Sequence, residues 1–172
     1  SISQYKDEIL KKIEAENLFV ITVNFRDETF DKYSELAFWG SQKRYEHYTD
    51  LRKEVTSLIT SNIESDMEDD IIVNYDSFVD RTQEYSDNAS LMLMRILQRV
   101  GVVSYYVAGF DGFTVNGSYY NKTDFSEERF RSQYDAINKG IAHQLSKFAE
   151  SLDRPEDIEF ITPSIYSNIF KR

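Results

Sequence analysis

Cysteine is absent from this chain of 172 residues, and proline occurs only twice. Without cysteine the chain can form no disulfide, no thiolate metal site and no thiol nucleophile. No stretch approaches the roughly 18 consecutive apolar residues of a membrane-spanning helix, and no signal peptide opens the sequence. We therefore expect a protein without a membrane span, located in the cytoplasm.

Basic side chains are in the minority. The chain has 20 lysines and arginines against 30 aspartates and glutamates, which gives a formal net charge of −10. An acidic surface repels phosphate backbones, so we expect no nucleic-acid partner. The two histidines, His47 and His143, lie far from any motif and have no obvious acid–base partner. The acidic stretch 64–70 shows no metal-ligand spacing, so the sequence indicates no metal site.

The length of the chain suits one domain with a substantial core. We expect residues 1–172 to form a single Rossmann-like domain. The sequence begins at Ser1 without an initiator methionine and leads directly into a helical pattern. We therefore expect the chain to be a piece of a longer polypeptide.

Apolar runs alternate with segments of helical periodicity. The run VVSYYVAG at 102–109 is apolar on both faces, as a buried parallel strand must be. Such runs predict strands at 18–25, 35–39, 55–60, 71–75, 102–108 and 158–161, and periodicity predicts helices at 3–16, 42–52, 86–99 and 126–150. The alternation predicts the α/β class: a Rossmann-like, mostly parallel sheet with helices on both faces. We expect the strands at 18–24 and 102–108 to be central, and the helix at 87–99 to pack on the sheet.

Several predicted strands end in small or polar residues. Because the carboxyl ends of parallel strands share one edge of a sheet, these residues could line a polar crevice for a nucleotide or a sugar. Small polar residues also make ordinary turns, so each position taken alone allows that simpler interpretation. The residues are Asn24, Gly40, Ser41, Ser61, Asn62, Gly109 and Asp111.

The start of the helix at 86–99 offers a second set of candidates, Asn88, Ala89 and Ser90. Free backbone N–H groups and the positive end of the helix dipole suit a phosphate there. An ordinary N-cap explains the same residues, and both interpretations stay open.

Asp111 is the residue we would expect to be catalytic if any residue of this chain is. It could bind a sugar hydroxyl or act as a base, although an Asx-turn beside Gly109 and Gly112 is the simpler role. Tyr119 and Tyr120 follow shortly after and could form a flap over the crevice.

Five landmarks span most of the chain: FWGSQKRY (38–45), LITSNI (58–63), DNASLMLMRIL (87–97), VAGFDGF (107–113) and EFITPSIY (159–166). Their order resembles the carboxy-terminal domain of bacterial aldolase-like proteins from surface-polysaccharide gene clusters. In those proteins a pyruvate-aldolase-type barrel of the HMG-CoA-lyase superfamily precedes this domain. The resemblance implies a nucleotide- or sugar-binding accessory domain, with an upstream catalytic domain that is a 4-hydroxy-2-oxovalerate aldolase-like lyase. The barrel's metal-binding histidine pair and its acid–base motif are missing here, so aldol chemistry cannot reside in these residues. We expect this fragment to be non-catalytic.

The chain is more distantly similar to bacterial sialyltransferases of the Rossmann-like type, which use CMP-sialic acid. Asn24 matches a nucleotide-contacting asparagine of that family, Asn88-Ala89-Ser90 its Ser-Gly helix start, and 109–120 its segment after the next strand. The family's catalytic histidine has no counterpart in 121–140, and its glycine-rich first loop is missing. The similarity implies nucleotide-sugar-dependent glycosyl transfer as an alternative function, and a non-catalytic interaction module is the third possibility.

Overall fold

The computed structural model describes residues 2–48, 54–82, 88–114 and 132–171. The chain forms two compact units. The sheet unit comprises Leu10–Asp80 and Asp87–Gly101, and the C-terminal unit comprises Ser1–Ile9, Arg81–Ser86 and Val102–Arg172. The expectation of a single domain for the whole chain stays a prediction.

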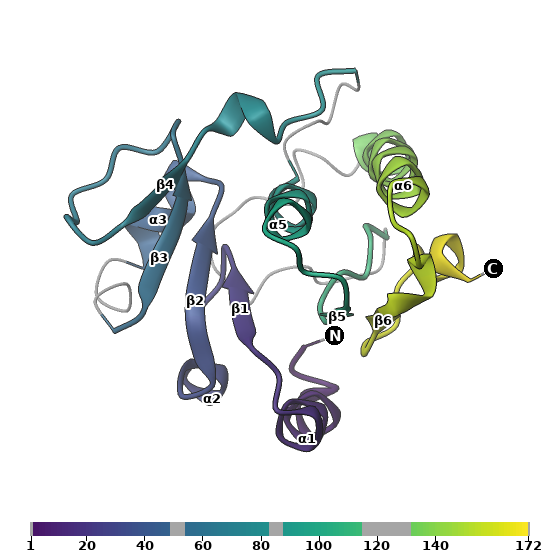
Figure 1. Cartoon of the computed structure of the whole chain (residues 1–172), viewed down its shortest axis with the longest axis horizontal. Helices are drawn as coiled ribbons and strands as arrows, with labels where there is room; N and C mark the ends of the chain where they lie inside the picture. The colour runs from purple at the N-terminus through teal and green to yellow at the C-terminus, as the bar shows by residue number, and fades with distance from the viewer. Residues whose placement is uncertain (1, 49–53, 83–87, 115–131, 172) are drawn as a thin grey trace. The chain divides into compact units, whose positions relative to one another are not determined.

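A four-stranded, all-parallel sheet forms the centre of the sheet unit (Figure 1). Its strands are β1 (Val20–Val23), β2 (Ser34–Trp39), β3 (Thr56–Thr60) and β4 (Ile71–Val73), in the spatial order β1-β2-β3-β4. The described helices of this unit are α2 (Glu28–Asp31), α3 (Gln42–His47) and α5 (Ala89–Arg99), with a 3₁₀ turn, η1, at Tyr75–Ser77. This arrangement is α/β and Rossmann-like, which confirms the predicted fold class.

Side chains of the inner strands alternate between two cores, one on each face of the sheet. The core on the α3 face contains Ala37, Trp39, Tyr45 and Ile59. The core on the α5 face contains Phe38, Leu58, Met92, Leu93 and Ile96. A strand segment covered on both faces must be apolar at every position, which is why the second half of β2, residues 36–39, reads as a continuous apolar run. The predicted packing of the 87–99 helix on the sheet is confirmed.

The C-terminal unit contains a second, two-stranded parallel sheet made of β5 (Tyr105–Val107) and β6 (Ile158–Phe160). The helix α6 (Tyr134–Glu150) buries an apolar face, and its Phe148 ring lies edge-on to Tyr105 at 5.9 Å between ring centroids. Two 3₁₀ turns, η3 (Pro155–Asp157) and η4 (Ser167–Phe170), flank β6 in the sequence. The first helix, α1 (Lys6–Glu16), spans the sequence boundary between the units.

The prediction that the strands at 18–24 and 102–108 are central is wrong. β1 pairs only with β2 among the described strands and forms one edge of its sheet, while β5 pairs with β6 in the second sheet. Both strands are parallel to their partners, as predicted. Their apolar runs include residues that solvent reaches, since Phe19 is 67% exposed and Val103 is 71% exposed. An apolar run shows how hydrophobic a strand is but not which strands pair with it. It therefore does not distinguish an edge strand from a central one.

The predicted capping residues of α5 agree with the ends of this helix in the structure. Asn88 is the N-cap of α5, and Gly101, with a φ of +90°, follows its C-cap as a terminating glycine should. The four-residue helix α2 was not predicted, because one turn is too short to show periodicity. Residues 126–131 of the helix predicted at 126–150 lie outside the described residues, and α6 begins at Tyr134. Among the helices that the structure describes, none is long and apolar enough to cross a membrane.

Candidate functional site

The carboxyl ends of β1 and β2 are tied together by Asn24. Its backbone has a left-handed φ of 50°, which asparagine tolerates better than most residues. In this conformation its Oδ1 accepts a hydrogen bond from the Gly40 N–H at 3.0 Å, and its own N–H donates to the Phe38 carbonyl at 2.9 Å. The side chain therefore fixes the path of the chain where both strands leave the sheet.

Gly40 allows the start of α5 to approach the end of β2 closely. A Cβ atom placed on Gly40 would lie 3.1 Å from Ala89 Cβ and 3.1 Å from Met92 Cε, which is tighter than ordinary van der Waals contact. A glycine on the strand and an alanine on the helix therefore leave space for each other. We call Asn24, Gly40, Ser41 and Asn88–Ser90 the strand-end cluster.

The first turn of α5 supplies backbone donors to this cluster. Asn88 Oδ1 accepts from the Leu91 N–H at 3.1 Å, so the N-cap interpretation of Asn88 is confirmed. The N–H groups of Ala89 and Ser90 precede the helical ladder and have no acceptor within α5. No acidic residue lies in that turn, so nothing within it opposes the positive end of the helix dipole.

Two side-chain groups of the strand-end cluster have no hydrogen-bond partner in the part of the chain that the structure describes. Ser41 is the N-cap residue of α3, yet its side chain makes no capping hydrogen bond. Within the described residues, neither the Ser41 hydroxyl nor Asn24 Nδ2 has a hydrogen-bond partner. Both residues are half-buried. Both groups can donate a hydrogen bond to a ligand.

Ser61 and Asn62 take the role of a turn. Both are exposed, and Ser61 joins the ends of two strands, because its N–H donates to the Val73 carbonyl at 2.8 Å and its Oγ accepts from the Tyr75 N–H at 3.1 Å. No hydrogen bond in the described part of the chain links either residue to Asn24 or Gly40.

The loop with Asp111 belongs to the C-terminal unit and is held by the segment after β6. The Gly109 N–H donates to Thr162 Oγ1 at 2.9 Å, and Ser164 Oγ donates to the Phe110 carbonyl at 2.6 Å. The Asp111 carbonyl accepts from the Ile165 N–H at 3.2 Å. The half-buried Asp111 therefore sits in a loop whose backbone is bonded on both sides of it.

Asn138 of α6 fixes the end of the same loop. Its Oδ1 accepts from the Phe113 N–H at 2.9 Å, and its Nδ2 donates to the Phe113 carbonyl at 2.7 Å. The Tyr166 hydroxyl donates to the same Oδ1 at 2.7 Å. Sequence reasoning named Asp111 but missed Asn138, because the amide lies in a predicted helix, 25 residues from the backbone it binds.

The expected gathering of all strand ends into one crevice is met only in part. Asn24, Gly40, Ser41 and the α5 start lie together in the sheet unit, whereas Gly109 and Asp111 belong to the C-terminal unit. That these two sets line one crevice stays a prediction. Tyr119 and Tyr120 lie outside the described residues.

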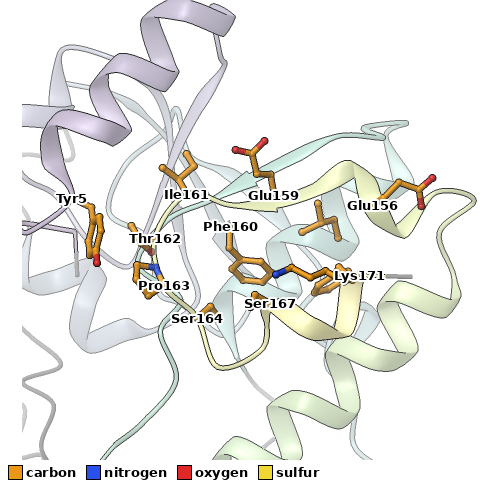
Figure 2. A pocket seen from close by; sticks show the side chains of 12 residues that line it. Tyr5, Glu156, Glu159, Phe160, Ile161, Thr162, Pro163, Ser164, Ser167 and Lys171 are labelled. Carbon is orange, nitrogen blue, oxygen red and sulfur yellow. The ribbon is translucent and has the colours of Figure 1, made fainter.

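A surface hollow of about 640 Å³ lies along β6 in the C-terminal unit (Figure 2). Rings, hydroxyls and charged groups line it, among them Tyr5, Glu159, Phe160, Thr162, Ser164 and Lys171. The sequence showed the relevant signal, since Thr162 and Ser164 follow a predicted strand just as Ser41 and Ser61 do. Both hydroxyls are committed to the Asp111 loop, so this hollow is partly a product of that loop's support.

Burial shifts the pKa of two described side chains. It raises the pKa of Tyr105, and it lowers the pKa of Arg95, where Asp80 partly offsets the effect. His47 and His143 are exposed. Among the described residues, no group of three or more histidines and acidic side chains could hold a metal ion.

We compared the chain with models of protein families, with curated proteins and with solved structures, and found no match in any of the three. The resemblance to aldolase-associated domains and the similarity to sialyltransferases therefore stay predictions. What this chain does has to be argued from its own geometry.

Proposed function

We propose that the sheet unit binds a nucleotide or a nucleotide-linked sugar at the strand-end cluster. The observation that carries the proposal is the contact at Gly40, where Asn24 binds the backbone of one strand end and Ala89 brings the start of α5 against it. In parallel α/β sheets, ligands bind beyond the carboxyl ends of strands, beside the start of a helix. The proposed role is that of an accessory domain in a cytoplasmic, aldolase-like enzyme of bacterial surface-polysaccharide synthesis. An upstream catalytic domain in the same polypeptide would carry the lyase chemistry.

The chemistry of the cluster favours an anionic ligand over a neutral sugar alone. The groups it offers are mostly donors: two backbone N–H groups at the start of α5, Asn24 Nδ2 and the Ser41 hydroxyl. Phosphate oxygens accept hydrogen bonds and do not donate at neutral pH, so this set suits the phosphate of a nucleotide. The small residues Gly40 and Ala89 allow a ligand to approach the backbone.

Calorimetry of the full chain with CMP, UDP, the matching sugar nucleotides and inorganic phosphate tests this proposal. We expect binding of the nucleotides, weakened about tenfold by Gly40→Ala, because the added Cβ pushes the start of α5 away from the strand. Gly101→Ala, at the other end of the same helix, is the matched control. Nothing lies within 4 Å of its added Cβ, so it strains only its own backbone at φ +90° and leaves affinity unchanged.

Two results would contradict the proposal. One is the absence of binding to every nucleotide in the panel, which would favour the interaction-module alternative. The other is an equal loss of affinity in Gly40→Ala and Gly101→Ala, which would mean that stability and not the cluster controls binding.

A further inference from the structure

The outer edge of β4 has no partner among the described strands. β4 is the last strand in the sheet order, and Figure 1 shows it on the side of the sheet opposite β1. The Val73 carbonyl accepts from the Ser61 N–H at 2.8 Å, so the backbone of Val73 faces inward toward the end of β3. Successive residues of a parallel strand direct their N–H and C=O groups to opposite edges. The N–H and C=O of Ile72 therefore face outward.

Both apolar layers of the sheet continue onto β4 and end there uncovered. Leu58 lies opposite Ile71 on one face, and Ile59 lies opposite Ile72 on the other. The β3 side chains are 6% and 0% exposed, whereas Ile71 is 50% exposed and Ile72 is 61% exposed. One more strand beside β4 would cover both isoleucines at once, which a helix packed on either face alone would not do.

The segment of the chain that contains β4 carries charge of one sign only. Residues 54–80 contain no lysine, arginine or histidine and eight acidic residues: Glu54, Glu64, Asp66, Glu68, Asp69, Asp70, Asp76 and Asp80. Most of them lie in the loop that leads directly into β4. In that loop Asp70 accepts hydrogen bonds from the hydroxyls of Tyr45 and Ser65, while Glu68 and Asp69 are exposed to solvent.

We propose that the edge of β4 binds an extended, cationic segment of a partner protein as a fifth strand. Its consecutive apolar side chains, which point to opposite faces of the sheet, would cover Ile71 and Ile72. Its backbone would pair with Ile72, and lysines or arginines at its end would lie beside Glu68 and Asp69. Strand addition supplies affinity through main-chain hydrogen bonds and specificity through alternate side chains. A second copy of this chain is a poor occupant, because pairing two β4 edges would bring two acid-rich segments together. The proposal does not depend on nucleotide binding.

The test uses the full chain and a synthetic peptide of two lysines followed by alternating valine and isoleucine, which is apolar on both faces. Calorimetry should detect binding that weakens as salt is added, and a peptide with glutamates in place of the lysines should bind at least about tenfold more weakly. Hydrogen exchange followed by NMR should show slower exchange at the Ile72 amide when the lysine peptide is bound.

A matched pair of variants separates the β4 edge from general surface hydrophobicity. Ile72→Thr keeps the β-branched shape and removes apolar contact, and we expect it to weaken peptide binding about tenfold. Val100→Thr makes the same type of change at a residue that is 74% exposed at the end of α5, and it should leave binding unchanged. Both positions are exposed, so both variants should fold.

Three results would overturn the proposal. The first is that the lysine and glutamate peptides bind equally well, or that neither of them binds. The second is binding that Ile72→Thr and Val100→Thr change to the same extent. The third is self-association of the chain in sedimentation experiments that Ile72→Thr abolishes, since a second copy would then occupy the edge.

Discussion

Substitutions at Asn24 separate the conformational role of this residue from its hydrogen bond and from its place beside a ligand. Asn24→Ala removes the acceptor for the Gly40 N–H, which costs about 1 kcal/mol for a partly buried bond. It also leaves an alanine at a φ of 50°, where residues other than glycine and asparagine lose about a further 1 kcal/mol. We expect the free energy of unfolding to fall by about 2 kcal/mol.

Two further variants separate the contribution of the hydrogen bond from that of the backbone conformation. Asn24→Gly keeps the left-handed backbone available but loses the hydrogen bond, so we expect a loss of about 1 kcal/mol. Asn24→Asp keeps an acceptor for Gly40 and should leave stability nearly unchanged. The same substitution adds a negative charge near the start of α5, so it should weaken the binding of an anionic ligand more than that of a neutral sugar.

Urea unfolding followed by tryptophan fluorescence measures the free energy of unfolding of the sheet unit, where Asn24 lies. Trp39 is the only tryptophan of the chain, is fully buried in β2 and precedes Gly40 directly. Its emission therefore reports on the sheet unit. Equal stability of Asn24→Ala and Asn24→Gly would refute the cost of the left-handed backbone, and an Asn24→Asp variant as unstable as Asn24→Ala would refute the role of the Oδ1 acceptor.

Three further predictions concern the C-terminal unit. Asn138→Leu should lower its stability by about 3 kcal/mol, because three hydrogen bonds of the Asn138 amide, two to the backbone of Phe113 and one from the Tyr166 hydroxyl, are lost together. Hydrogen exchange should locate the loss at this loop, and a loss below about 1 kcal/mol would contradict the role of the amide. Burial raises the pKa of Tyr105 above its ordinary 10.0, so its contribution to stability is present below pH 10 and is lost as the pH rises further. Tyr105→Phe should reduce this alkaline loss in pH-dependent unfolding, and an unchanged alkaline loss would contradict the role of Tyr105. Mixed with CMP-sialic acid or UDP-sugars and a range of acceptors, the chain should release no nucleotide above background, whereas turnover that disappears in Asp111→Asn would support the glycosyltransferase alternative.

Sequence alone determined the features that depend on neighbouring residues. The alternation of apolar runs with helical periodicity was enough to predict the α/β class, since the faces of strands and helices must each be covered. The ends of α5 were equally readable, because Asn88 and Gly101 act on backbone groups within a few residues of themselves. The polar strand ends Asn24 and Gly40 could be named as site candidates for the same reason.

Only the tertiary structure decided which of these local features meet. Strand pairing joins segments far apart in the sequence, so nothing in the apolar runs showed that β1 is an edge strand or that β5 pairs with β6. The hydrogen bond from Gly40 to Asn24 and the contact of Gly40 with Ala89 likewise cross 16 and 49 positions of the chain. The apolar run at 71–75 predicted a strand but not that Ile71 and Ile72 are exposed, because burial depends on what packs against a side chain and not on the side chain itself.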